Sequence, residues 1–263
     1  MNECDRAARV IHPGIFRHID PGFERLAPGF SRPRHAHLSA YVSIVLEGTY
    51  EQASYAGRMR IEPGDILIQP VLDRHESRAV RMRELHLLRL AWFAEPGVGG
   101  LYRSANVDLV IRTARRDPRA ASGLLEELMQ NAAHRPVATR DWPDLLAAHM
   151  RSGATHLTSW ARTHRLSRET VSRGFLRTYG VTPRAFAAEF KAREAWIRVV
   201  SGQESLAAIA DELGYADQPH MTRAVRALTG APPDAWRRRL SLSAPAPRTP
   251  ARTSAAHWRD SGR

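Results

Sequence analysis

Cysteine is almost absent from the sequence, and this absence limits how the chain is held together. Its one cysteine, Cys4, has no partner within the chain, so an intrachain disulfide is excluded and a reducing compartment is favoured. The first ten residues, MNECDRAARV, lack the apolar stretch of a secretory signal peptide. No apolar run approaches the roughly 20 residues that a membrane-spanning helix needs. We therefore expect a cytoplasmic protein with no membrane partner.

Lysine is equally scarce, and the positive charge comes almost entirely from arginine. Lys191 is the only lysine, although the formal net charge is +12. Residues 151–240 contain 15 Lys and Arg against 8 Asp and Glu, and residues 241–263 contain 4 against 1. A genome rich in arginine codons explains the type of cation, but it does not explain why acids are scarce after residue 150. The distribution favours a partner with a phosphate backbone.

The first part of the chain has the pattern of a β-rich domain. Short apolar stretches at 41–46, 66–68 and 85–92 are separated by turn signals such as Pro63-Gly64-Asp65. Strands at this spacing are typical of a sandwich or a barrel.

Residues 104–150 change to a helical pattern. Apolar residues recur at helical spacing around Val107, Val110 and Ile111, and again from Leu124 to Met129. These narrow stripes could pack on the β domain or on a second subunit, and the sequence leaves both possibilities open. After Leu240 the chain is rich in Ala, Pro, Ser and Arg, so we predict a disordered basic tail over 241–263.

Two segments of the basic region repeat one another. Residues 157–186 align with 206–236 at an offset of 49, and one inserted residue changes the offset to 50, which pairs Arg173 with Arg223 and Gly180 with Gly230. Either segment alone reads as an ordinary α-hairpin. Because both occur in register within the basic region, we predict two helix-turn-helix units.

The first unit has the residues of a recognition helix. Ser167 is a suitable N-cap for a helix from about 168 to 179, which ends at Gly180. We predict that Val171, Phe175 and Leu176 face inward. The outward face then presents small polar groups and arginines that can contact bases or phosphates: Glu169, Thr170, Ser172, Arg173 and Arg177.

The second unit repeats this design with different outward residues. Asp217 can cap its second helix, while Met221, Val225 and Leu228 face inward. The predicted DNA-contacting residues are Gln218, His220, Thr222, Arg223 and Arg226. Between the units, residues 184–200 have the pattern of one continuous helix, with Phe186, Phe190, Ile197 and Val200 on one face and Trp196 near its edge. Such a helix would hold the two units near one DNA turn apart, about 34 Å.

Residues 154–240 resemble the DNA-binding domain of the AraC/XylS family of bacterial transcription regulators. The most specific stretch is Ile209-Ala210-x-x-Leu213-Gly214-Tyr215-x-x-Gln218-x-x-x-x-Arg223, followed by Gly230-x-x-Pro233. The resemblance implies two helix-turn-helix motifs joined by a long helix, with a recognition helix of each in the major groove. Pro219 departs from the polar residue usual at its position, but proline is tolerated in the first turn of a helix.

The N-terminal region looks like the cupin barrel that such regulators carry as an effector domain. In metal-binding cupins, two histidines of an H-x-H motif, a glutamate four residues later and a further histidine bind the ion. Here His35 and His37 form the H-x-H, His75 is the later histidine, and Tyr41 replaces the glutamate. Three imidazoles could still hold Zn, Fe, Ni or Cu. We favour an interpretation with no metal and no cofactor, in which these four residues line a small-molecule effector pocket or the histidines simply form hydrogen bonds at the mouth of the barrel.

Together these features predict a multidomain α and β protein. Its expected parts are a cupin-like β-barrel over 15–100, a helical linker over 101–150 that could dimerise, an all-α double helix-turn-helix over 154–240 and the tail. We expect a non-enzymatic transcription regulator that binds promoter duplex DNA and a small-molecule effector. RNA polymerase and a second copy of the chain are further candidate partners. The alternative is a metal-dependent cupin enzyme fused to a DNA-binding domain.

Overall fold

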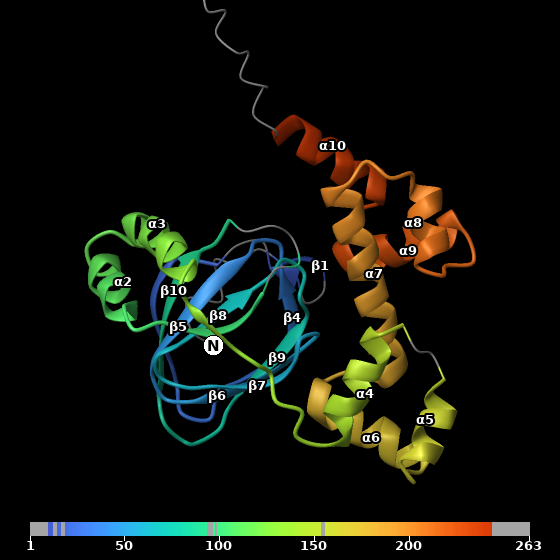
Figure 1. Ribbon diagram of the computed structural model, residues 1–263, viewed down its shortest axis with the longest axis horizontal. Coiled ribbons are helices and arrows are strands. Elements are labelled where there is room, and N and C mark those ends of the chain that lie inside the picture. Colours follow the sequence, from blue (N-terminus) through green and yellow to red (C-terminus); the bar gives the residue numbers. More distant parts are fainter. Residues whose placement is uncertain are drawn as a thin grey trace, which may run out of the picture.

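The computed structural model describes residues 10–12, 15–16, 19–93, 97, 99–153 and 156–243. Within these ranges, a β-barrel lies beside a set of helices, and one long helix runs along the boundary between them (Figure 1). Cys4 and residues 244–263 of the predicted tail lie outside the described residues. The expectation of disorder was wrong for 241–243, because they complete the helix α10 (Pro233–Ser243).

The barrel consists of two sheets of six strands among the described residues. The first contains β1 (Val10–His12), β2 (Ile15–Phe16), β4 (Ser31–His37), β9 (His75–Ala79), β6 (Tyr50–Ser54) and β7 (Gly57–Ile61), in this order. The second contains β12 (Ala133–Arg135), β11 (Gly100–Arg103), β8 (Asp65–Gln69), β5 (Tyr41–Glu47), β10 (Leu85–Ala91) and β3 (Gly22–Leu26). The predicted strands at 41–46, 66–68 and 85–92 are confirmed as β5, β8 and β10.

The apolar run of β5 is explained by burial on both faces of its sheet. Val42 and Ile44 face outward and pack with residues of α2 and α3, whereas Val45 faces the barrel interior. Alternate residues of a strand point to opposite faces, so a sheet that is covered on both sides needs a nearly continuous apolar sequence.

The two helices of the linker pack on the barrel of their own chain. Helices α2 (Val107–Ala114) and α3 (Pro118–Met129) bury Val110, Ala114, Ala121 and Leu125 against the outer face of the second sheet. The narrow apolar stripes of this region are therefore buried against the barrel of the same chain. The region is not wholly helical, because β12 pairs antiparallel with β11.

The remaining helices form two compact units that share the long helix α7 (Pro183–Ser201). The first unit contains α4 (Trp142–Arg151), α5 (Leu157–Thr163) and α6 (Arg168–Tyr179), and the second contains α8 (Leu206–Glu212), α9 (Gln218–Thr229) and α10. Each unit has its own apolar core, and opposite ends of α7 contribute to the two cores. The core of the first unit includes α4, a segment that the sequence pattern assigned to the linker.

Two predicted helix faces were wrong. In α6 the third inward residue is Tyr179, which is fully buried, while Leu176 is 46% exposed. In α7, Trp196 is central to the second core and not at its edge, whereas Ile197 is only partly buried. In α6, the hydroxyl of Tyr179 donates to Asp144 of α4, which lies outside the repeat. In α7, Trp196 packs on Trp236 within the second unit.

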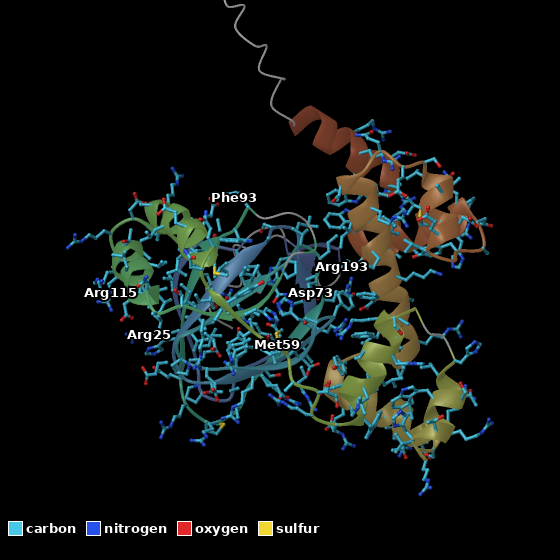
Figure 2. The ribbon with its side chains drawn as sticks, viewed as in Figure 1. Arg25, Met59, Asp73, Phe93, Arg115 and Arg193 are labelled. Carbon is cyan, nitrogen blue, oxygen red and sulfur yellow. The ribbon has the colours of Figure 1, made fainter. Side chains whose placement is uncertain are left out.

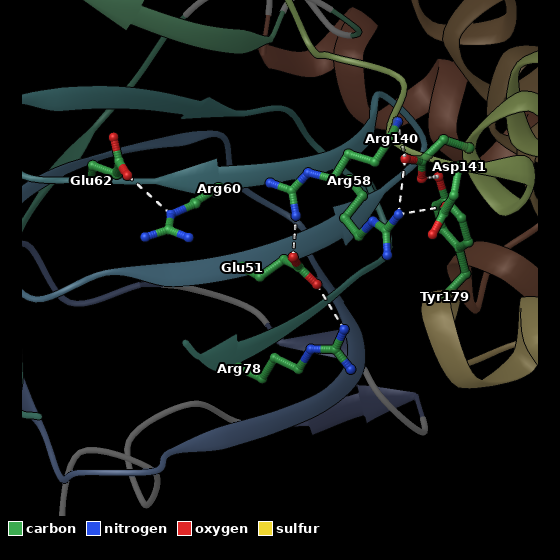
Figure 3. Close-up of polar contacts among 9 residues, drawn as sticks. Glu51, Arg58, Arg60, Glu62, Arg78, Arg140, Asp141 and Tyr179 are labelled. Atoms are coloured by element: carbon green, nitrogen blue, oxygen red, sulfur yellow. Dashed lines mark hydrogen bonds and ion pairs between the residues drawn. The ribbon is translucent and has the colours of Figure 1, made fainter. Parts of the chain in front are cut away.

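A polar network joins the barrel to the first helical unit (Figure 3). Arg58 of β7 donates to Asp141 at 2.6 Å and to Asp144 of α4 at 3.1 Å. Asp144 also accepts a hydrogen bond from the hydroxyl of Tyr179, at 2.8 Å. On the neighbouring strand, Glu51 accepts from Arg78 at 2.7 Å and from Arg140. Among the described helices, none combines the length and the apolarity needed to cross a membrane.

Candidate DNA-binding surface and the barrel beside it

The first candidate recognition helix, α6, begins and ends as the sequence predicts. The hydroxyl of Ser167 accepts a hydrogen bond from the backbone N–H of Thr170 at 3.0 Å, which satisfies one of the orphan donors of the first turn. Gly180 ends the helix in the left-handed conformation, with φ 68°. The predicted contact residues are all exposed, and they come from one stretch of the helix: Glu169, Thr170, Ser172, Arg173 and Arg177.

The second candidate recognition helix, α9, has the same construction. Asp217 accepts a hydrogen bond from the backbone N–H of His220 at 2.6 Å, and Gly230 ends the helix with φ 79°. Pro219 lies in the first turn, where its missing N–H would have no helical partner. Gln218, His220, Arg223 and Arg226 are exposed, while Thr222 is half-buried. The predicted inward residues of α9 are confirmed: Met221, Val225 and Leu228 are buried.

The two matched arginines differ in their surroundings. Arg173 forms an ion pair with Glu169 one turn earlier, at 2.6 Å, and the two side chains are 75% and 67% exposed. A pair this exposed contributes little to stability, about 0.3–0.5 kcal/mol, so a phosphate or a guanine edge can replace the carboxylate at small cost. No ion pair is recorded for Arg223 among the described residues. Within the described part of the chain, the arginine of the second helix is thus outside any ion pair, unlike that of the first.

The helix α7 sets the spacing of the two units. Its 19 residues rise by about 1.5 Å each, which gives a length of about 28 Å. Thr182 caps its N-terminus and Pro183 occupies its first position. The spacing of the two recognition helices by about one turn of DNA, about 34 Å, stays a prediction.

The four residues of the predicted effector pocket come together inside the barrel. His35 of β4 lies directly opposite His75 of β9, with ring centroids 4.3 Å apart. The ring of His37 is 4.9 Å from that of His35 and 5.1 Å from that of Tyr41. One ring nitrogen of each of the three histidines lies within 4.8 Å of those of the other two, and all three residues are buried.

The histidines are held in a defined state. The Nδ1 of His35 lies 2.8 Å from the carbonyl of Pro33, and the Nδ1 of His75 lies 2.8 Å from the carbonyl of Asp73. Burial, reinforced by the repulsion that a protonated His75 would exert, lowers the pKa of His35 to about 2, and burial lowers the pKa of His75 to about 3. The pKa of His37 is also lowered well below its ordinary value, chiefly by burial. All three imidazoles are therefore neutral at neutral pH.

The space beside these histidines is small. It amounts to about 20 Å³, which holds about one water molecule, and its walls include Arg32, Arg89 and Gln52. Burial raises the pKa of Tyr41 to about 12, so its hydroxyl stays protonated. The four residues of the predicted effector pocket thus form a buried polar cluster with little empty volume beside it, and their binding of an effector stays a prediction.

A larger cavity lies between the barrel and α7. It has a volume of about 220 Å³, and Tyr55, Gln69 and Asp73 of the barrel face Phe190 and Arg193 of α7 across it. Figure 2 shows Asp73 and Arg193 side by side at this boundary. The side chain of Arg193 is 6% exposed and donates from Nε to the carbonyl of Val71 at 3.2 Å. Its Nη2 has no hydrogen-bond partner among the described residues.

The barrel also holds α7 through an ion pair and a hydroxyl. Arg34 of β4 lies 3.0 Å from Glu189 of α7 and donates to the carbonyl of Tyr179 at 3.3 Å. Glu189 also accepts from the hydroxyl of Tyr55, at 3.2 Å, and lies 3.9 Å from Arg74. Sequence reasoning missed Arg34, Arg74 and Glu189, because each looks like an ordinary surface charge in the sequence.

An apolar anchor from the barrel enters the second helical unit. Leu72, in the turn between β8 and β9, is fully buried and belongs to the core formed by α7, α8 and α9. It holds a positive φ of 56°, which is unusual for leucine, and its N–H donates to the carbonyl of His37 at 2.8 Å. Tyr55 has the corresponding role in the core of the first unit. The barrel therefore contacts both units.

Comparison with known proteins supports the helical part of this description. The sequence model of a family described as "Helix-turn-helix domain" matches residues 160–239. No curated protein matches the chain.

Among solved structures, ToxT from Vibrio cholerae O395, bound to (E)-4-(8-methylnaphthalen-1-yl)but-3-enoic acid, is 9% identical. The match covers 84% of this chain and 98% of that one, with a TM-score of 0.37. The C-terminal domain of AraT, a response regulator from Geobacillus stearothermophilus, is 21% identical over 37% of this chain and 80% of its own, with a TM-score of 0.33. A cupin superfamily protein from Desulfitobacterium hafniense DCB-2 is 16% identical over 26% and 60%, with a TM-score of 0.24.

Proposed function

We propose that this chain, whose residues 160–239 are an AraC-type helix-turn-helix domain, is a DNA-binding transcription regulator that is controlled through its N-terminal barrel. The observation that carries this proposal is the pair of capped, exposed helices α6 and α9 on one connector. Both present an arginine at the same position of the repeat, Arg173 and Arg223. Arginine can read guanine with two hydrogen bonds, and the small polar residues beside it can contact bases or phosphates.

The DNA-binding proposal is tested by affinity measurements on a native promoter fragment. Arg173→Ala and Arg223→Ala should each weaken binding by about 1–3 kcal/mol, or roughly 5-fold to 150-fold. Arg119→Ala is the matched control, because Arg119 is an exposed arginine on α3, on the far side of the barrel (Figure 1). Affinity should also fall steeply as salt is raised, because bound phosphates release counterions. If neither arginine variant binds more weakly than the control, α6 and α9 are not the recognition helices.

We place the small-molecule effector in the cavity between the barrel and α7. Its volume of about 220 Å³ suits a small organic molecule, whereas the space at the histidines holds about one water. Phe190 and Met59 supply apolar walls, and Arg193 supplies a cation in the lining of the cavity. The complementary effector has an apolar body and an acceptor oxygen, such as a carboxylate. Because it would touch α7 and the barrel together, its binding would change how they are docked.

A panel of small aromatic and aliphatic carboxylic acids tests this placement by thermal shift. A ligand of the cavity should raise the melting temperature of the wild type, and Arg193→Lys should reduce that rise because the bidentate fork is lost. Arg162→Lys on α5 is the control, since Arg162 is exposed and distant from the cavity. An equal rise in all three proteins would place the ligand elsewhere.

Two further partners belong to the proposal. A second copy of the chain would cover Phe23 and Leu109, which are both 46% exposed; light scattering across a concentration series tests for the dimer. RNA polymerase is the partner implied for an activator, and transcription from the native promoter in vitro tests for it.

The alternative of a metal-dependent enzyme needs room for a substrate at the histidines, where the space is about 20 Å³.

A further inference from the structure

The turns of the two helix-turn-helix units share one backbone geometry but differ in sequence. At the offset of 49, the N–H of Arg165 and the N–H of Gly214 each donate to the carbonyl three residues earlier, at 3.0 and 2.8 Å. The next residues, Leu166 and Tyr215, each donate to the carbonyl five residues earlier, at 2.9 and 2.8 Å. Both turns also hold a residue in the left-handed conformation, with φ 53° at Arg165 and φ 67° at Gly214. The repeat therefore compares an arginine with a glycine in one and the same conformation.

Arg165 is the less suitable residue for this conformation. At positive φ the Cβ of a side chain crowds the backbone, whereas glycine has no Cβ and adopts the conformation freely. Strain of this kind persists where the surrounding structure enforces it, and it gathers at residues with a function. Arg165 is exposed, and within the described part of the chain its guanidinium has no hydrogen bond and no ion pair. Contacts with the described residues therefore do not offset the strain.

The charge beside the two turns differs as well. Residues 157–168 contain no Asp or Glu, and three of them are exposed arginines: Arg162, Arg165 and Arg168. The matching residues of the second unit, 206–217, include three acids and no Lys, Arg or His. Neither Arg162 nor Arg168 forms an ion pair with another described residue. Two turns of the same shape thus carry opposite charge, and the first of them attracts an anion.

We propose that Arg165, supported by Arg162 and Arg168, binds a phosphate of the DNA backbone and anchors the first unit on the duplex. This inference rests on the proposed function, in which α6 and α9 bind DNA. In complexes of helix-turn-helix proteins, the first helix crosses the backbone while the N-terminal residues of the recognition helix reach the bases. The turn that joins these two helices therefore lies beside phosphates. The planar guanidinium of arginine matches two phosphate oxygens with parallel hydrogen bonds.

The position of the turn leaves it open to such a partner. Helix α5 and the start of α6 lie on the side of the first unit that faces away from the barrel (Figure 1). The contact is independent of base sequence, because every step of the duplex carries the same phosphate. Arg165 therefore has a different effect from Arg173, which is placed to read bases. The second unit, with Gly214 at the matching position, lacks this contact.

Affinity for two duplexes tests the contact. Arg165→Gly should weaken binding to a native promoter fragment and to an unrelated duplex of equal length by the same factor, about 3-fold to 10-fold at moderate salt. The slope of log K against log salt concentration should become shallower by about 0.9, because one phosphate fewer is neutralised. Arg119→Ala is the matched control: it removes one exposed arginine from α3 and should leave affinity and slope as in the wild type. Unchanged affinity in Arg165→Gly, or a loss confined to the promoter fragment, overturns the phosphate contact.

Thermal unfolding separates the strain from the charge. Arg165→Gly and Arg165→Ala both remove the guanidinium, so a difference between them reports the left-handed conformation. Alanine stabilises an ordinary position relative to glycine, but at positive φ the order reverses. The glycine variant should therefore have the higher melting temperature, while both variants bind DNA equally weakly. A glycine variant that melts below the alanine variant contradicts the strain, and unequal DNA binding contradicts the role of the guanidinium.

The same two duplexes also test the proposed function on its own. The wild type should prefer the promoter fragment over the unrelated duplex, and Arg165→Gly should keep that preference because its base-reading residues are intact. If the wild type shows the preference and Arg165→Gly binds as tightly, the phosphate contact is overturned and the regulatory function stands. If the wild type binds neither duplex, both are overturned.

Discussion

Truncation of Leu72 to alanine should loosen the barrel from the second helix-turn-helix unit while each part remains folded. Leu72 is the barrel residue that is fully buried in the core of α7, α8 and α9. It also holds a left-handed backbone conformation, with φ 56°, which costs a non-glycine residue about 1–3 kcal/mol. Burial of the side chain offsets that strain. Alanine would keep the strain and lose most of the burial.

The size of the effect follows from the burial. Leucine-to-alanine changes at fully buried positions cost about 2–5 kcal/mol, because the lost transfer energy is increased by the cavity left behind. A turn at a domain boundary can relax more than a rigid core, so we take about 3 kcal/mol. This corresponds to a change of roughly 100-fold in the equilibrium between docked and undocked barrel.

Hydrogen exchange over α8 and α9, together with thermal unfolding, checks this prediction. Leu72→Ala should speed exchange in these two helices and lower the melting temperature. Leu109→Ala on α2 is the matched control, since Leu109 is 46% exposed and its truncation should cost well under 1 kcal/mol. If both variants change exchange and melting temperature equally, Leu72 does not anchor the barrel and the interpretation of this boundary is refuted.

Three further substitutions probe the first helical unit, each by thermal or urea unfolding. Asp144→Ala should lower the free energy of unfolding by about 3 kcal/mol, because it removes the buried carboxylate that accepts from Arg58 and leaves the guanidinium of Arg58 poorly paired. A loss below about 1 kcal/mol would contradict this. Gly174→Ala should destabilise by about 1–3 kcal/mol despite the better helix propensity of alanine, since its Cβ would lie 2.4 Å from the ring of Trp142; a more stable variant would show that α4 and α6 do not pack so closely. Ser167→Ala should cost about 1 kcal/mol through loss of the N-cap, and an unchanged stability would argue against the cap.

The features that the sequence predicted well are those that depend on neighbours in the chain. The caps at Ser167 and Asp217 follow from residue type and from the start of an apolar period, and both are confirmed. The buried strands were also recognisable, because a doubly covered strand such as β5 has a nearly unbroken apolar run.

The features that were missed depend on contacts between distant segments. Tyr179 replaces Leu176 in the core because its hydroxyl meets Asp144 of α4, outside the repeat from which the inward face was predicted. Arg34 and Glu189 are 155 positions apart, and nothing in the local pattern of either marks it as a partner. The histidines could be found by spacing alone, but the size of the space beside them could not, because volume depends on every wall.

The barrel contributes a side chain to the core of each helical unit, and this arrangement has a consequence for bound DNA. With Tyr55 in one core and Leu72 in the other, the protein has little freedom to adjust the distance between its two recognition helices. If that distance differs from the helical repeat of DNA, the duplex must bend or twist so that both helices can bind. If α6 and α9 both bind the duplex, the base pairs between the segments that they contact should contribute to affinity through their stiffness. Flexible pyrimidine–purine steps in that interval should mark the stronger operators.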